Sequence, residues 1–302
     1  MALGRDRPRL TGMAESDVLG GYLSAIGACD GDKSHAKLLH GQFHDVVLLG
    51  SVAYRFPRDE ESRHLLPSRI ALLQILRSHD LPVQIPALVS DAAVGEPLGQ
   101  CYVALQRVPG QPIEADQVAE ASAQSGAIAD LTVLLDRLLE LGADFAIQEV
   151  VPRAGALSWQ RFADDVASVL FPLMSPDGRA RAGAELTRVL AVDPTGEALV
   201  HGDLGGANLL WTGADSELRL AGSLDWDGAQ IGNQADDLAS IAATLGWPLA
   251  VQVDARRHDG ETPTVADARA IAATFALQQA LPAALSGDTV ALDDGLLGYR
   301  ER

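Results

Sequence analysis

The sequence predicts an α+β protein of two lobes, a small β-rich lobe at residues 1–108 and a larger, mainly helical lobe at residues 109–302. Three observations support this prediction. Short apolar segments bounded by turn residues are concentrated in the first third of the chain, as is typical of strands. The sequence Pro109-Gly110-Gln111-Pro112 is the strongest break in the first half. Beyond it the chain is rich in Ala and Leu, which favour helices.

The first lobe is expected to contain a β-hairpin followed by a helix. Apolar segments on both sides of Gly50–Ser51 predict the hairpin, which pairs Val46–Leu49 with Val52–Phe56. Leucines at helical spacing predict a helix over Ser62–Leu76, and Pro67 is expected to limit where that helix starts. Residues 1–14 are expected to be frayed. The other predicted elements are a short helix, Val18–Ile26, and two strands, Ala87–Ser90 and Cys101–Val108.

The second lobe is expected to be built from helices with only two short strands. Turn residues bracket the two strand segments, Ala198–Val200 and Leu218–Leu224. The Ala- and Leu-rich segments predict five helices at Val118–Leu141, Trp159–Leu170, Ala180–Leu190, Asp236–Leu245 and Ala266–Leu285.

Charge and cysteine content exclude several classes of protein. The chain of 302 residues has 41 acidic and 23 basic residues and a net charge of −18, which argues against nucleic-acid and anionic-membrane partners and permits a cationic substrate. Two cysteines are too few for a disulfide framework or a Cys-rich zinc site. No segment predicts a signal peptide or a membrane span, so a cytoplasmic protein is expected.

Three nucleotide or hydrolase motifs are absent or defective. The segment from Gly27 to Ser34 resembles a P-loop, but Asp32 stands where the second glycine is needed, and its carboxylate would face phosphate. There is no G-x-G-x-x-G dinucleotide motif and no G-x-S-x-G nucleophile elbow.

The informative residues lie between His201 and Trp226. Asp203 and Asn208 are five positions apart on a loop between apolar segments, and Asp225 ends a later strand. Phosphoryl transfer needs this set, because one carboxylate orients the attacking hydroxyl while a carboxamide and a second carboxylate hold Mg²⁺ against the nucleotide phosphates. The residues thus predict a phosphotransferase.

These motifs resemble those of the aminoglycoside phosphotransferase family, small-molecule kinases with a protein-kinase-like fold. The family motif H-G-D-x-x-x-x-N is matched by His201–Asn208, and its metal-binding segment is matched by Leu224-Asp225-Trp226. The later G-D-P-x-x-D-L-A pattern is similar to Gly232–Ala239. Upstream, the first nucleotide loop, the strand with the phosphate-contacting cation and the hinge are similar to residues 41–47, 54–58 and 105–112.

The resemblance implies a role for each matching residue. Asp203 would be the catalytic base, and Asn208 and Asp225 would bind Mg²⁺. His201 and Asp237 would support the catalytic loop, and Asp236 is expected to be a solvated neighbour. The nucleotide, ATP or GTP, would be held by Arg55, by Gly41 and Phe43 of the first loop, and by the hinge residues Gln106 and Val108.

Four residues or segments depart from the family pattern. Arg55 stands where Lys is common, and Arg forks rather than acting as a point charge. The helical Glu that should pair with this cation is missing from Ser68–Leu76, where Arg69 and Gln74 are the polar residues. His44 stands where Asn or Ser is common, and Gly232-Asn233-Gln234 replaces G-D-P. These departures leave the choice between ATP and GTP open.

The acceptor implied by the resemblance is a small molecule with a hydroxyl, and the acidic balance favours an aminoglycoside-type, cationic antibiotic. A macrolide or a metabolite alcohol remains an alternative, as do an inactive kinase-like binding protein and a two-metal phosphohydrolase. The C-terminal residues expected to face a cationic acceptor are Asp254, Asp259, Glu261, Asp293 and Asp294. Those that could line an apolar pocket are Trp159, Phe162, Phe171, Trp247 and Phe275.

Overall fold

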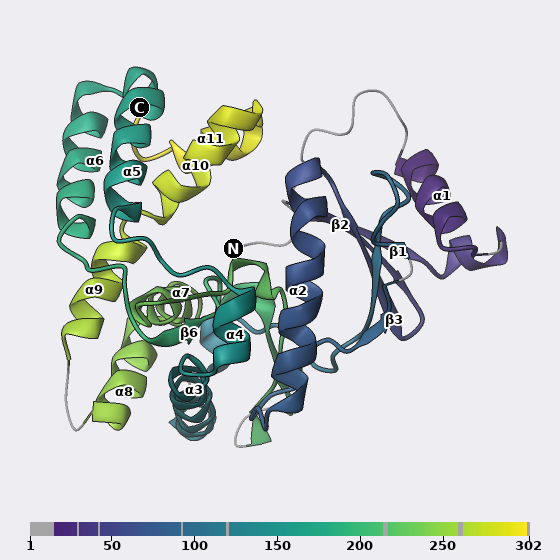
Figure 1. Cartoon of the computed structure of the whole chain (residues 1–302). Coiled ribbons are helices and arrows are strands. Elements are labelled where there is room, and N and C mark those ends of the chain that lie inside the picture. The colour runs from purple at the N-terminus through teal and green to yellow at the C-terminus, as the bar shows by residue number, and fades with distance from the viewer. Residues whose placement is uncertain are drawn as a thin grey trace.

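A twisted sheet of five strands forms the smaller part of the molecule in a computed structural model of the chain (Figure 1). The structure describes residues 15–28, 30–41, 43–91, 93–118, 121–213, 217–258 and 262–300. The expected fraying of residues 1–14 lies outside these ranges. The strand order is β1-β2-β3-β5-β4, all antiparallel, with β1 (Lys37–His40), β2 (His44–Leu49), β3 (Val52–Pro57), β4 (Leu88–Ser90) and β5 (Val103–Gln106).

The predicted hairpin is confirmed as β2 and β3. Leu49 pairs with Val52 across the two-residue turn, and Gly50 adopts a φ of 59° there. Such a positive φ suits the tight turn between two twisted strands and is favourable for glycine. This hairpin pairs Arg55 of β3 with Val46 of β2, two residues after His44 at the start of that strand.

Helices cover both faces of the sheet. Helix α1 (Glu15–Ala25) packs on the side away from the larger lobe, and α2 (Glu60–Ser78) lies between the sheet and the larger lobe (Figure 1). The expectation that Pro67 limits the start of α2 was wrong, because the helix runs through it. Asp59 caps the helix by accepting from the Ser62 N–H at 2.7 Å, and the buried apolar face continues on both sides of Pro67. This capping and packing outweigh the one backbone hydrogen bond that proline removes.

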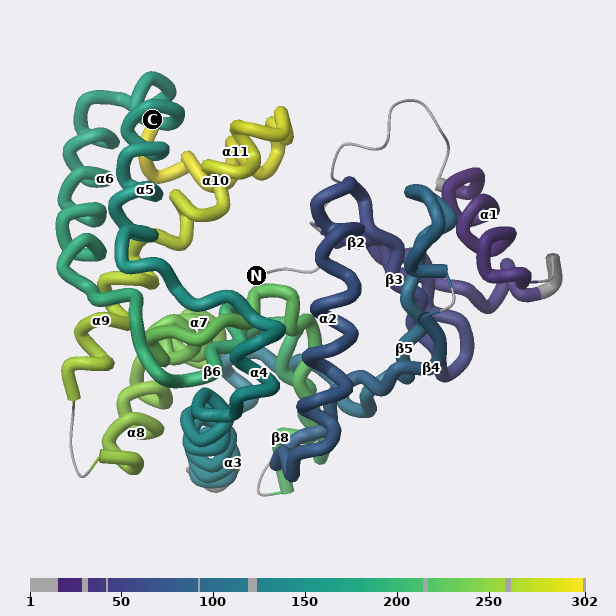
Figure 2. Tube along the Cα trace, viewed as in Figure 1, coloured from purple at the N-terminus to yellow at the C-terminus, as the bar shows by residue number. Residues whose placement is uncertain are grey.

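The larger lobe is mainly helical, as predicted, with α7 near its centre and α3 at its lower edge in the view of Figure 2. The expected helix over 266–285 is divided in two, because the buried Thr274 ends the first half by donating its hydroxyl to the Ile271 carbonyl at 2.7 Å. The sequence also failed to predict α4, α8 and α11. The helices are α3 (Ala121–Leu141), α4 (Phe145–Val150), α5 (Ser158–Asp165), α6 (Pro176–Val189), α7 (Ala235–Leu245), α8 (Trp247–His258), α9 (Pro263–Ala272), α10 (Phe275–Ser286) and α11 (Thr289–Gly295).

Two small antiparallel pairs of strands carry the loops of interest in this lobe. One joins β6 (Ala198–Val200) to β9 (Gln230–Gly232), and the other joins β7 (Leu209–Thr212) to β8 (Arg219–Ser223). The two strands predicted here, β6 and β8, are thereby confirmed, whereas β7 and β9 were not predicted.

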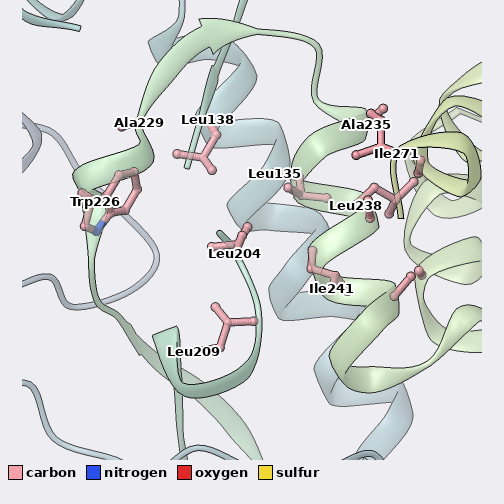
Figure 3. Packing of buried hydrophobic residues seen from close by; sticks show 14 of the residues in the cluster. Leu135, Leu138, Leu204, Leu209, Trp226, Ala229, Ala235, Leu238, Ile241 and Ile271 are labelled. Carbon is pink, nitrogen blue, oxygen red and sulfur yellow. The ribbon is translucent and has the colours of Figure 1, made fainter. Parts of the chain in front are cut away.

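One hydrophobic core runs from α2 through the larger lobe. Leu204, in the loop between β6 and β7, and Leu209, the first residue of β7, belong to the same buried cluster as Leu135 and Leu138 of α3 (Figure 3). Leu204 and Leu209 are almost completely buried. The loop that carries the family motif is therefore anchored from below by apolar contacts, which fix its polar side chains.

The residues that the structure describes include no helix long and apolar enough to cross a bilayer. The boundary between lobes at residues 108 and 109 stays a prediction. β5, the last strand of the five-stranded sheet along the chain, ends at Gln106.

Candidate active site

The loop between β6 and β7 is held in a tight conformation by a close approach of two backbones. Gly202 has a φ of 84°, and a Cβ atom there would lie 2.6 Å from the carbonyl oxygen of Gly228. Only glycine fits such a position. The His-Gly-Asp segment is thus packed directly on the turn that follows Asp225.

Asp203 and Asn208 meet at the open side of this loop. The Asn208 Nδ2 donates to the Asp203 carboxylate at 2.8 Å and to its carbonyl at 3.0 Å, which leaves the Asn208 Oδ1 free to accept or ligate. Burial raises the pKa of Asp203, and the negative charge of Asp225 raises it further, while the hydrogen bond from Asn208 opposes the shift. A carboxylate at the open side of the loop whose pKa is raised in this way suits a proton acceptor.

Asp225 lies directly beyond β8 in an unusual backbone conformation. Its φ of 58° and ψ of 64° are left-handed, and it is the one non-glycine residue with positive φ in the part of the chain that the structure describes. Aspartate tolerates this conformation better than most residues, at a cost of about 1–2 kcal/mol. Strain of this size is typical of a residue whose position matters for function.

Arg55 of β3 binds this aspartate and a second one. Its Nη2 lies 2.9 Å from the Asp225 Oδ1 and 2.9 Å from the Asp227 Oδ2. Burial raises the pKa of Asp225, but the Arg55 guanidinium outweighs this effect and holds the pKa below its ordinary value. Asp227 is the carboxylate partner of Arg55 that the sequence could not name, and it comes from the turn after β8 rather than from a helix.

His44, at the start of β2, belongs to the same cluster. Its Nδ1 lies 3.3 Å from Arg55 and 3.2 Å from Asp227, and its side chain is 6% exposed. Burial and the neighbouring guanidinium lower the pKa of His44 to about 4. The imidazole is therefore neutral at physiological pH, and its Nε2 has no hydrogen-bond partner in the part of the chain that the structure describes.

His201 and Asp237 lie beneath the loop, away from its open side. Asp237, completely buried at the start of α7, accepts the backbone N–H groups of His201 and Gly202, both at 3.0 Å. The His201 Nε2 lies 2.8 Å from the Leu224 carbonyl, and its Nδ1 accepts from the Asp203 N–H at 3.3 Å. Those contacts assign the neutral Nε2–H tautomer and tie the Asp203 loop to the Asp225 strand.

The buried neutral His201 predicts a loss of stability in acid. Burial lowers its pKa to about 4 from 6.5, so between these values the unfolded chain binds the proton that the folded chain excludes. Acidification from pH 7 to pH 5 should therefore reduce the free energy of unfolding by about 2 kcal/mol through this group. Urea unfolding at both pH values measures the change. His201→Gln should show a smaller change, whereas His64→Gln on the exposed side of α2 should keep the wild-type change; equal changes in all three proteins would contradict the prediction.

The predicted nucleotide-loop residues lie near this cluster, at the edge of the sheet. Gly41 accepts from Arg58 Nη1 at 2.8 Å through its carbonyl, and a Cβ atom at Gly41 would lie 2.8 Å from the His44 carbonyl. Phe43 is 51% exposed next to them. These positions leave the loop open for a ligand, while its base is fixed by Arg58.

The predicted hinge residues lie where the chain leaves the sheet. The Gln106 N–H donates to the Ala87 carbonyl at 2.7 Å, so that donor is already used within the sheet. The side chain of Val108 lies against the backbone of Gly222 in β8. A Cβ atom at position 222 would collide with the Val108 side chain. Their role in purine binding stays a prediction.

A hollow of about 300 Å³ lies beside the catalytic loop, on the side of the C-terminal helices. Gly202 and Gly228 form one wall of it, and Asp236 of α7 another. Burial raises the pKa of Asp236 to about 7, and its carboxylate has no hydrogen bond or ion pair with any described residue. Asp236 is partly exposed and faces the hollow, and the expectation that it is a solvated neighbour of Asp237 stays a prediction. Three of the predicted aromatic residues line the same hollow: Trp159, Phe162 and Phe275.

The acidic residues predicted for the acceptor are engaged elsewhere. Asp254 is completely buried and accepts from the Thr262 backbone and hydroxyl, so it does not face a ligand. Asp293 pairs with Arg300, and Asp294 accepts from Gln279 at 2.8 Å. The other two, Asp259 and Glu261, lie outside the described residues. Of the remaining aromatic residues, Trp247 packs under the Arg269 guanidinium, and Phe171 does not line the hollow.

Comparison with known proteins agrees with this geometry. Residues 36–286 match the model of the phosphotransferase enzyme family, whose short name is APH. The chain belongs to this family. Viomycin phosphotransferase from Streptomyces vinaceus is 38% identical over 260 residues, which cover 86% of this chain and 91% of that protein. The resemblance drawn from the sequence motifs is thus confirmed, and the protein is a small-molecule kinase.

Solved structures of this APH protein's relatives share its fold. The GDP and kanamycin complex of APH(2″)-IIIa superposes with a TM-score of 0.74 at 21% identity and covers 87% of this chain and 90% of that one. Macrolide 2′-phosphotransferase MphH from Brachybacterium faecium gives a TM-score of 0.65 at 22% identity, with 95% and 100% covered. The predicted bilobal, kinase-like α+β fold is confirmed.

The sequence analysis did not name three residues as contributors to this candidate site: Asp227, His44 and Asp236. Each lies within a few positions of a motif residue or on an expected element. For two of them, the sequence contained a feature that could have indicated the role. Asp227 follows Asp225 by two positions, and His44 was noted only as a departure from the family pattern. What the sequence could not show is that β2, β3 and the turn after β8 converge.

Proposed function

We propose that this kinase transfers the γ-phosphate of ATP or GTP to a hydroxyl group of a cationic antibiotic. The observation that carries the proposal is the placement of Asp203, Asn208 and Asp225 within interaction distance, each on a segment anchored in the core. Asp203 accepts the proton of the attacking hydroxyl as the bond to phosphorus forms. Its raised pKa makes it a better acceptor than a free carboxylate.

Mg²⁺ fits the donor set at Asn208 and Asp225. Both offer oxygen ligands, which Mg²⁺ prefers, and the hydrogen bonds of Asn208 Nδ2 to Asp203 leave its Oδ1 free. Within the described residues there is no cluster of three or more His, Cys, Asp or Glu side chains that could enclose a metal. Two oxygen ligands from the protein are enough for Mg²⁺ when the nucleotide phosphates supply further ligands. Bound there, the ion would neutralise charge on the transferred phosphoryl group.

Arg55 supports the nucleotide side of the site. Its two carboxylate partners, Asp225 and Asp227, fix the position of the guanidinium. Arg55 stands at the position where the family has its phosphate-contacting cation. Gly41 and Phe43 would cover the phosphates, and the backbone at Gln106 and Val108 would face the purine. The GDP bound by the structural relative supports a nucleotide in this fold.

The hollow beside Gly202 is the proposed acceptor site. It adjoins the loop of Asp203, so a bound hydroxyl can reach the base, and the unpaired Asp236 carboxylate favours a cation there. The net charge of −18 also favours a cationic acceptor. The relatives named for viomycin and kanamycin point to the same class. The aromatic wall and the macrolide phosphotransferase among the relatives make a macrolide the second candidate.

Acceptor-dependent nucleotide turnover tests the proposal. Purified protein with Mg²⁺ would be given ATP or GTP in turn, with viomycin, kanamycin, gentamicin, streptomycin, a macrolide or small metabolite alcohols as acceptors. Turnover that requires a cationic antibiotic supports the proposal. Turnover with a macrolide alone transfers it to the second candidate, and nucleotide hydrolysis that no acceptor stimulates would contradict both.

Removal of the Asp236 charge should weaken acceptor binding without weakening the chemical step. Asp236→Asn is expected to raise KM for a cationic acceptor about tenfold or more, because a charge-assisted contact is lost in a partly desolvated hollow. The change in kcat should be small. Asp293→Asn, on the exposed end of α11, is the matched control and should leave KM unchanged. Steady-state kinetics at saturating nucleotide measures both, and an unchanged KM in Asp236→Asn would assign acceptor recognition elsewhere.

A further inference from the structure

Arg69 is a charged residue in the middle of the buried face of α2. One stripe of this helix consists of residues that are each less than a tenth exposed: Ser62, Leu66, Leu73 and Leu76. Successive members are four, seven and three positions apart, so one helical position is missing between the second and the third. Arg69 occupies the missing position of this stripe, three residues after Leu66 and four before Leu73. Its Nε is completely covered, and its side chain has no hydrogen bond or ion pair with any described residue.

A guanidinium in such a place needs a counter-ion. Arg69 is partly buried, removal of a cation from water without a partner is unfavourable, and burial lowers the pKa of Arg69 accordingly. The carboxylates that influence it are those of Asp227 and Asp225, but both are bound by Arg55. The anion that would complete the contacts of Arg69 is therefore not supplied by this cluster.

A second unsatisfied nitrogen belongs to the same cluster. His44, which contacts Arg55 and Asp227, is 6% exposed, and its Nε2 has no partner among the described residues. Buried polar atoms are nearly always satisfied in folded proteins. Two orphaned nitrogens next to the proposed metal and phosphate groups indicate a polar ligand that this part of the protein is built to receive.

We propose that Arg69 binds a phosphate group of the donor nucleotide, so that α2 presents a cation to the nucleotide where the family presents an acid. The inference rests on the proposed phosphotransferase function. Arg55 is then held by Asp227, which takes over the part of the missing helical Glu, and the forked Arg69 guanidinium is left for phosphate oxygens. The turn at 226–228, which carries Asp227, packs against α2, so one arrangement of backbone serves both arginines.

Calorimetric binding of nucleotides and of nucleosides tests the role of Arg69. Arg69→Met keeps the length of the apolar stem and removes the charge, Arg69→Lys keeps the charge, and Arg77→Met on the exposed last turn of α2 is the control. ATP and GTP are the phosphate probes, and adenosine and guanosine lack the phosphate. We expect Arg69→Met to raise Kd for the nucleotide about ten- to a hundredfold and to leave nucleoside binding unchanged.

The same variant should be more stable than the wild type to urea, because an unpaired desolvated charge is replaced by an apolar side chain. Arg69→Lys should retain part of the nucleotide affinity, and Arg77→Met all of it. An unchanged nucleotide Kd in Arg69→Met, or an equal loss of nucleoside affinity, would overturn the inference. A wild-type protein that binds neither nucleotide would instead remove the proposed function, and the inference with it.

Discussion

Replacement of Asp203 by asparagine should reduce acceptor-dependent turnover by about 10²- to 10⁴-fold, the usual loss for a general base. The side chain of asparagine has nearly the same shape and can still bond to Asn208, but it cannot take the proton of the attacking hydroxyl. Nucleotide and acceptor binding should therefore change little. The measurement is kcat with saturating nucleotide and acceptor, together with Kd for the nucleotide by calorimetry.

Asp164→Asn on α5, where the wild-type carboxylate only accepts from Gln160 on the exposed surface, is a matched control that should keep full activity. Asp203→Ala removes the hydrogen bond with Asn208 as well and should be at least as inactive as Asp203→Asn. Retention of more than a tenth of the wild-type kcat in Asp203→Asn would show that another group accepts the proton.

The fold was predictable where local sequence and long-range packing agree. The β2–β3 hairpin is specified by Gly50 and two apolar segments, so its register follows from the turn itself. The helix α2 shows the opposite case, because local propensity disfavours Pro67 while the apolar stripe and the Asp59 cap require a continuous helix. The packing of the apolar stripe outweighs the unfavourable propensity of Pro67. The local sequence alone does not show how large the packing contribution is.

The site was predictable in its motif and not in its surroundings. The motif residues could be recognised in the sequence from their types and spacing: Asp203, Asn208 and Asp225. The partners of Arg55 are set by the convergence of β2, β3 and the turn after β8, segments up to 172 positions apart. The position of Asp236 in the wall of a hollow could not be predicted for the same reason, since it depends on the helices that close around it.

The acid that pairs with the β3 cation comes from a different element than the family pattern implies. Arg55 remains on β3, but its acid comes from the turn after β8, two residues beyond the proposed metal ligand. Asp225 and Asp227 thereby share one guanidinium, and Asp225 contacts it from a left-handed backbone conformation. Arg55, Asp225 and the left-handed conformation consequently form one unit, in which a change at Asp225 affects charge, metal binding and backbone strain together.

Substitutions at Asp225 can separate these three contributions. Asp225→Asn keeps a side chain that tolerates the left-handed conformation and can accept from Arg55, but it removes the charge. Asp225→Gly removes charge and strain together, and Asp225→Ala removes the charge and retains the strain. All three should lower kcat by about 10²-fold or more, because the phosphates lose a fixed ligand and a displacement of about 1 Å is enough for such a loss.

Their stabilities should differ in a defined order. Asp225→Gly should exceed Asp225→Ala in free energy of unfolding by about 1 kcal/mol, the strain of a left-handed alanine, with Asp225→Asn between them or near the glycine variant. Urea unfolding at pH 7 gives the order, and kcat measured over a range of Mg²⁺ concentrations gives the catalytic loss. If Asp225→Asn lost activity but recovered it at high Mg²⁺, the charge would serve mainly to raise metal affinity. If all three retained wild-type kcat, Asp225 would serve only to hold Arg55, and the metal ligands would have to be sought elsewhere in the loop.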